Sequence, residues 1–173
     1  ATCPAHLTAA CVAQRNGEHF ALLGSSRGHL LLLSAAGWRR VPLQTRVVRS
    51  ICVLGDDFII AHGRGVHVLP ITSPDAEPTP IAKLPDHSAL AVAFDASRNS
   101  CWIVGRTWIG EYRQGSFNLV LPSMKDPFFP DIISIALLPD ERGGIYFGER
   151  AGCLHWTPID GLEEFERINA LDE

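Results

Sequence analysis

The sequence lacks the features that mark membrane-spanning or exported proteins. Its 173 residues contain no apolar run of about 18 residues, the length at which a segment is expected to form a transmembrane helix. The start, Ala1 to Ala5, lacks the basic region and apolar core of a secretory signal peptide. These absences argue against a membrane partner and favour a cytoplasmic protein, with a leader removed from the chain as the alternative.

Basic charge is scarce relative to acidic charge. Lys and Arg number 15 against 19 Asp and Glu, which gives a net charge of −4 and a pI near 6.0. Nucleic acids and anionic membranes attract basic surfaces. The sequence as a whole therefore predicts no nucleic-acid partner, although a local basic patch stays open.

The cysteines and histidines do not form a metal-binding or disulfide pattern. The five cysteines have an odd count and no Cys-x-x-Cys spacing, which argues against a disulfide framework and a zinc site. The seven histidines share no common position in the repeat described below. We therefore expect no metal and no other cofactor, and we interpret the cysteines as small buried hydrophobes of a reducing compartment.

Motifs of catalysis are missing as well. The sequence has no Gly-x-Ser-x-Gly nucleophile elbow, no P-loop and no Gly-x-Gly-x-x-Gly. Its acidic pairs, such as Asp56-Asp57, lie in polar turns, where solvated charge is the usual state. The sequence does not predict an enzyme.

What the sequence does contain is a pattern that occurs four times. An apolar run ends at a small residue, a short turn follows, and a second apolar run begins. The small residues are Gly24, Ala61, Gly105 and Gly148, separated by 37, 44 and 43 residues. The runs are about 4–6 residues long, rich in Ile, Val, Leu and Phe, and broken by Gly, Pro, Asn and Asp, which favours strands over helices.

Two further strands are expected in each copy. One precedes the pair, at 7–13, 47–53, 89–94 and 132–138. A weaker one follows it, at 38–42, 79–82, 117–121 and 165–168. Periodicity does not decide whether the acidic tail after Gly161 is an edge strand or a short helix. Each copy of the repeat therefore predicts four strands.

This repeat resembles the β-propeller superfamily, in which each repeat forms one four-stranded blade. The apolar-Gly-x-x-x-Gly-apolar hairpin is similar to the degenerate blades of sensor and citron-type propellers, or to WD40-like blades. The resemblance implies an all-β fold of four four-stranded antiparallel blades in a single domain over residues 1–173. The blades are expected at about 7–43, 44–84, 85–123 and 124–168. Four blades could form a small ring, an arc completed by a second copy as a homodimer, or part of a longer ring.

The turns between the paired runs are the candidate binding surface, because in a propeller they share one face. They carry Arg27, Arg64, Arg106 and Arg150. Guanidinium groups suit carboxylates and other anions, often in bidentate geometry. His62 and Trp108 lie in the same turns and could add stacking. Phe128 and Phe129, in a proline-bounded loop between blades, are candidate anchors for a partner.

Two functions are consistent with a propeller that carries these turn residues. We favour a non-catalytic protein-interaction module whose loop face binds another protein with an acidic or mixed surface, for example as a dedicated inhibitor or immunity-type protein. The alternative is a small-ligand site of glycan-binding or hydrolytic type at the central axis. Its candidate residues are the tryptophans Trp38, Trp102, Trp108 and Trp156, of which Trp102 and Trp156 also have the character of blade core.

Overall fold

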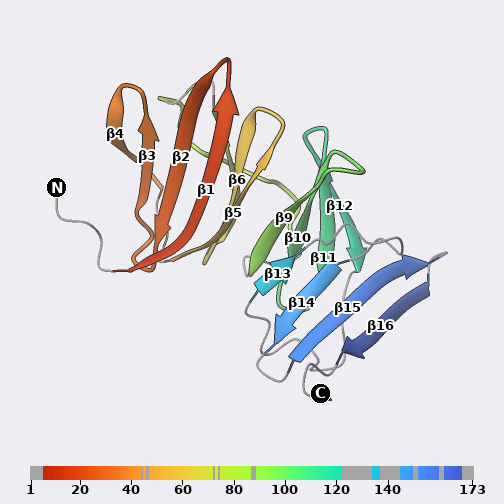
Figure 1. Cartoon of the computed structure of the whole chain (residues 1–173). Coiled ribbons are helices and arrows are strands. Elements are labelled where there is room, and N and C mark those ends of the chain that lie inside the picture. The colour runs from red at the N-terminus through yellow and green to blue at the C-terminus, as the bar shows by residue number, and fades with distance from the viewer. Residues whose placement is uncertain are drawn as a thin grey trace. The chain divides into compact units, whose positions relative to one another are not determined.

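A computed structural model describes residues 6–43, 45, 47–71, 73, 75–86 and 89–121 with their side chains, and the strands at 134–136, 145–149, 152–159 and 162–168 by their backbone. The chain divides into two compact units, Ala1–Ser123 and Met124–Glu173, and each is described by itself (Figure 1). The regular structure of the described residues consists of β-strands. None of these residues forms a helix long and apolar enough to cross a bilayer.

The first unit consists of three four-stranded antiparallel sheets, which we call blades 1, 2 and 3. In each blade the strands pair in chain order. Blade 1 contains β1 (Leu7–Arg15), β2 (Glu18–Ser25), β3 (Leu30–Ser34) and β4 (Gly37–Val41). Blade 2 contains β5 (Val48–Leu54), β6 (Asp57–His62), β7 (Gly65–Pro70) and β8 (Thr79–Pro80). Blade 3 contains β9 (Ala91–Asp95), β10 (Ser100–Val104), β11 (Ile109–Arg113) and β12 (Ser116–Leu121).

The second unit contains one more sheet of the same kind, blade 4. Its strands are β13 (Ser134–Ala136), β14 (Ile145–Glu149), β15 (Gly152–Ile159) and β16 (Leu162–Ile168), again paired in chain order. The described part of the acidic tail is a strand, because β16 pairs with β15 from Leu162 to Ile168. The predicted all-β fold of four four-stranded antiparallel blades is confirmed.

Burial on both faces explains the continuous apolar run of β6. Phe58 and Ile60 pack into the core shared with blade 1, whereas Ile59 and Ala61 pack into the core shared with blade 3. All four side chains are fully buried. Successive side chains of a strand point to opposite faces, so a strand covered on both faces needs apolar residues at every position.

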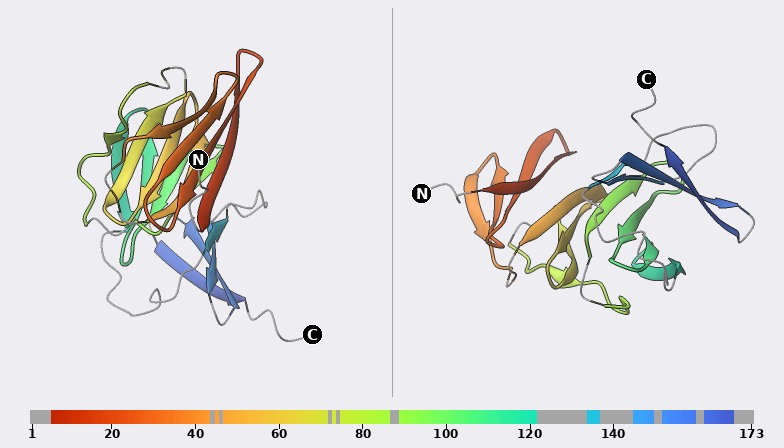
Figure 2. Two further views of the ribbon diagram at one scale, coloured as in Figure 1. Left: turned by 90° about the vertical axis from the view of Figure 1, so that its left-hand side faces the viewer. Right: turned by 90° about the horizontal axis from the view of Figure 1, so that it is seen from below.

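The inner strands of neighbouring blades are tied together by side-chain hydroxyl groups. Thr8 Oγ1 in β1 donates a hydrogen bond to the carbonyl of Val48 in β5. Ser50 Oγ in β5 donates one to the carbonyl of Val92 in β9 at 3.1 Å. Because β5 and β9 are edge strands of their sheets, these bonds connect blades through main-chain groups. Figure 2 shows the three sheets of the first unit standing one beside the next.

Lack of space explains the small residues that end the first apolar run of the repeat. Backbone conformation explains the glycines at the turn ends. A Cβ on Gly24 would lie 2.3 Å from Cγ1 of Val48, and one on Gly105 would lie 2.1 Å from the Trp108 ring. The glycines at two turn ends, Gly28 and Gly65, have φ of +75° and +124°. Those left-handed conformations favour glycine.

Candidate functional site

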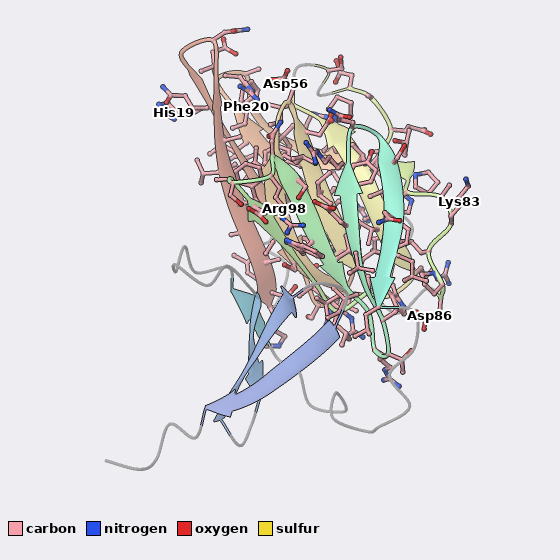
Figure 3. The ribbon with its side chains drawn as sticks, turned by 90° about the vertical axis from the view of Figure 1, so that its right-hand side faces the viewer. His19, Phe20, Asp56, Lys83, Asp86 and Arg98 are labelled. Atoms are coloured by element: carbon pink, nitrogen blue, oxygen red, sulfur yellow. The ribbon has the colours of Figure 1, made fainter. Side chains whose placement is uncertain are left out.

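The candidate site is one edge of the first unit, where the turns after β2, β6 and β10 lie. The β1–β2 and β3–β4 hairpins are at the upper end of blade 1 in Figure 1, so the β2–β3 turn is at the lower end. We use the name arginine edge for these three turns and the described residues of the connections between blades, at 42–47 and 81–90. Figure 3 shows Asp86 of this edge at the opposite end of the unit from His19 and Asp56.

In blade 1 the turn is held by Ser25. Its Oγ accepts hydrogen bonds from the backbone N–H groups of Arg27 at 3.3 Å and His29 at 3.0 Å. The Gly28 N–H donates to the Ser25 carbonyl at 3.0 Å. A serine hydroxyl that accepts from nearby backbone N–H groups stabilises a tight turn. The backbone of Arg27 is thereby fixed, while its side chain is exposed.

In blade 2 a histidine takes the place of that serine. The backbone N–H of Arg64 donates to Nδ1 of His62 at 3.1 Å. Arg27 and Arg64 are each two residues beyond a side chain that caps their N–H, so they are equivalent in their caps, although the blade 1 turn is longer than the blade 2 turn. The Arg64 side chain is exposed, as that of Arg27 is.

The connection from blade 1 to blade 2 runs between these two turns. A Cβ on Gly28 would lie 2.0 Å from the carbonyl oxygen of Thr45, so the Arg27 turn packs directly on the connection. The Gly63 N–H, next to Arg64, donates to the carbonyl of Val47 at 3.0 Å. The two arginine turns are therefore joined through one short segment of backbone.

The blade 3 turn is built differently. Arg106 directly follows Gly105, the small residue of the repeat, so it occupies the repeat position of Ser25 and His62, and its side chain is exposed. The Gly105 N–H donates to the Trp108 carbonyl at 2.9 Å. Arg106 is thus at the same edge but is not the equivalent of Arg27 and Arg64.

Trp108 is part of the core and not of an exposed stacking surface. It is 1% exposed, packs edge-on against Phe117 with ring centroids 5.8 Å apart, and donates from Nε1 to Asp86 Oδ1 at 3.0 Å. The prediction that its ring faces a partner is therefore wrong for this conformation. The reason is the connection from blade 2 to blade 3, which supplies Asp86 and lies far from Trp108 in sequence.

His62 is buried as well, at 1% exposure, so it does not offer a stacking face either. Its Nε2 forms a hydrogen bond with Nδ1 of His67 at 2.7 Å, and the two ring centroids are 4.7 Å apart. Burial, the neighbouring His67 and the charge of Arg64 lower the pKa of His62 to about 4. Burial also lowers the pKa of His67. Both rings are therefore neutral at pH 7.

Two arginines of the opposite edge are paired within the protein, whereas the exposed Arg113 there forms no ion pair within the described residues. At the opposite edge, Arg15 forms an ion pair with Asp56, and Arg98 forms one with Asp95 at 3.9 Å. Within the described residues, Arg27, Arg64 and Arg106 form no ion pair. The turns and connections of the arginine edge, as far as they are described, contain a single carboxylate, that of Asp86.

Sequence reasoning missed Arg49, which lies next to this edge. The pairing of β5 with β6 shifts between Val48 and Ser50, so Arg49 is the extra residue of a β-bulge opposite the end of β6. A bulge changes the direction in which a side chain points, and Arg49 is exposed. No local sequence signal marks such a bulge. The remaining predicted site residues, Phe128, Phe129 and Arg150, lie outside the described residues.

The buried cysteines form a contact but no disulfide. Sγ of Cys52 and Sγ of Cys101 are 3.3 Å apart, and both thiols are free. The contact with Cys101, followed by burial, holds the pKa of Cys52 well above its usual range. A protonated thiol is a poor nucleophile. The described part of the chain contains no group of three or more His, Cys, Asp and Glu that could hold a metal ion.

Comparison with solved structures identifies the architecture. The extracellular domain of BT4673 from B. thetaiotaomicron matches 94% of this chain and 22% of its own length, with 12% identity and a TM-score of 0.65. A protein assigned as a gluconolactonase matches 86% of this chain and 59% of its own, with 14% identity and a TM-score of 0.62. The computationally designed Ika4 protein matches 94% and 91%, with 14% identity and a TM-score of 0.58. The chain therefore has a β-propeller fold.

These likenesses show the fold alone, because all three identities are low. The chain spans about a fifth of the BT4673 domain chain and about three fifths of the chain assigned as a gluconolactonase. No protein-family model matches the sequence, and no curated protein matches it. The chemistry of the site must therefore be argued from this chain's own residues.

Proposed function

We propose that this protein is a non-catalytic interaction module that binds another protein through the arginine edge. The observation that supports this most is the set of three exposed arginines, Arg27, Arg64 and Arg106, in the turns of three consecutive blades. None of them has an ion-pair partner within the described residues. A partner would supply the missing anions.

The expected partner surface is acidic. Guanidinium groups form bidentate hydrogen bonds with carboxylates, and such pairs are stronger than neutral hydrogen bonds. Arg27 and Arg64 are well suited to this task because their backbones are fixed by caps and by the shared connection. A fixed backbone reduces the conformational entropy that binding must remove. A dedicated inhibitor that covers an acidic site on a cytoplasmic target is one form of this function.

Charge reversal of the equivalent pair tests the proposal. We expect Arg27→Glu combined with Arg64→Glu to reduce partner capture from an extract of the native host at least tenfold, since attraction becomes repulsion. Captured protein would be quantified by mass spectrometry at two salt concentrations. The melting temperature should change by only a few degrees, because both side chains are exposed.

A control of equal charge change comes from the opposite edge. Arg98 and Arg113 are exposed and lie at the other end of blade 3. The Arg98→Glu, Arg113→Glu protein should capture the partner as the unaltered protein does. Equal loss in both double variants would show a nonspecific effect of net charge, and undiminished capture by the Arg27, Arg64 variant would rule out the arginine edge.

A further inference from the structure

The two equivalent arginine turns differ in the chemistry of their caps. Ser25 caps Arg27 with a hydroxyl oxygen, which does not titrate in the physiological range. His62 caps Arg64 with a ring nitrogen, and its other ring nitrogen contacts a second histidine, His67. Imidazole is the side chain whose protonation changes between pH 5 and 8. One turn therefore depends on a titrating group, and its counterpart does not.

The hydrogen bonds of the pair define where its protons lie. Nδ1 of His62 accepts from the Arg64 N–H, so this nitrogen carries a lone pair and the proton is on Nε2. The His62 Nε2–H then donates to Nδ1 of His67, whose own proton is on its Nε2. With both rings neutral, this single arrangement satisfies the contacts among Arg64, His62 and His67.

A single added proton cannot be placed without breaking this chain of bonds. If His67 takes the proton, its Nδ1–H faces the Nε2–H of His62, so His62 must move its proton to Nδ1 to accept. If His62 takes the proton, both of its nitrogens become donors. In either case Nδ1 of His62 carries a hydrogen and no longer accepts from the Arg64 N–H.

We propose that the His62–His67 pair makes the presentation of Arg64 depend on pH. The neutral pair holds the Arg64 turn in the same capped form as the Arg27 turn, and uptake of one proton releases the Arg64 N–H. The functional consequence rests on the proposed role of the arginine edge, because Arg64 is one of its three arginines. Release of one turn loosens one of the two equivalent contacts with a partner.

The described carboxylate of this edge is Asp86, in the connection from blade 2 to blade 3, where its Oδ1 accepts from Trp108 Nε1. Arg64, in the pair's own turn, is positive and acts on His62. Arg49, also positive, is at the bulge of β5, whose neighbour Val48 pairs with His62. Asp57 is at the other end of β6, and β8, which pairs with His67, consists of Thr79 and Pro80. Protonation is therefore expected below the pH at which an exposed histidine titrates, between pH 6.5 and about 4.

Nuclear magnetic resonance of the protein alone tests this inference and needs no partner. In an amide titration from pH 7.5 to 4.5, the Arg64 amide signal should shift together with the ring nitrogens of His62 and His67. The Arg27 amide in the same sample is the internal control and should not follow that transition. An Arg64 amide that does not move while the rings titrate would overturn the proposal.

Two variants test whether the His62 cap causes the pH response of the Arg64 amide. His62→Ser gives blade 2 the cap of blade 1, and it should abolish the pH response of the Arg64 amide. His67→Gln keeps an acceptor for the His62 Nε2–H without a second titrating ring, and it should move the response to lower pH. If His62→Ser does not fold, His67→Gln alone decides, and an unchanged midpoint in that variant would contradict the mechanism.

The outcome is separable from that of the proposed function. If the Arg64 amide responds to pH but charge reversal does not change partner capture, the titrating cap is supported and its role in binding is contradicted. If the Arg64 amide does not respond to pH but partner capture depends on the arginine charges, the binding role of the arginine edge is supported and its regulation by pH is contradicted.

Discussion

At the residue scale, the clearest requirement concerns Gly28. Its φ of +75° is in the left-handed region, and a Cβ there would lie 2.0 Å from the carbonyl oxygen of Thr45. The position therefore excludes a side chain for two independent reasons, conformation and contact. The conformation belongs to the backbone of the Arg27 turn, and the contact comes from the packing of that turn on the connection between blades 1 and 2.

A matched pair of substitutions separates these two reasons. Gly28→Ala should lower the free energy of unfolding by about 2–4 kcal/mol, because the connection must move as well. Gly17→Ala should cost only about 1 kcal/mol, since Gly17 has a similar φ of +80° but nothing within 4 Å of its would-be Cβ. Urea unfolding of the two variants measures the difference, and equal losses would show that the contact with Thr45 is unimportant.

Titration of the buried histidines should also appear in the stability of the protein. The pKa of His62 is about 4 in the folded chain and 6.5 in the reference state, and that of His67 is lowered too. The unfolded chain therefore binds protons more readily, so the stabilising contribution is complete above pH 6.5 and is lost as pH falls toward 4.

The melting temperature provides the measurement. It should fall by several degrees between pH 7 and pH 5 in the unaltered protein, and less in a His62→Ser, His67→Gln variant. Circular dichroism at the two pH values is sufficient. An identical decrease in both proteins would mean that other groups, and not this histidine pair, cause the acid sensitivity.

Sequence chemistry at the residue scale identified which side chains are exposed charges but not which are caps. The exposure of Arg27, Arg64 and Arg106 follows from their place in polar turns. The burial of His62 and Trp108 does not, because it depends on His67 across the hairpin and on Asp86 from a connection 22 residues earlier. Contacts of this kind leave no local pattern in the sequence.

At the scale of the elements, the strand pattern was readable because each blade repeats the same apolar runs. The predicted fourth strand of blade 2, at 79–82, is shorter in the structure, where β8 covers only Thr79–Pro80. Proline has no N–H to donate to a ladder, so a strand at this position is short. The β5 bulge that re-aims Arg49 was not predicted, because a one-residue register shift is set by pairing with β6.

At the scale of the whole molecule, charge is distributed unevenly over a net acidic chain. The net charge is −4, yet the described turns and connections of the arginine edge carry Arg27, Arg64, Lys83 and Arg106 against Asp86. At the opposite edge the arginines Arg15 and Arg98 are paired within the protein. Within the described residues, the arginine edge combines several cations that have no ion-pair partner with a single carboxylate, and such an edge suits an acidic partner.

The central claim is that the arginine edge is the surface that contacts the partner, and hydrogen–deuterium exchange on the captured complex tests it most directly. Peptides that contain residues 25–29, 62–65 and 105–108 should exchange more slowly in the complex than in the free protein. Peptides from the opposite edge, at 14–18, 55–57 and 95–99, should exchange at the same rate in both. Slower exchange confined to the opposite edge, with the three arginine turns unchanged, would contradict the account.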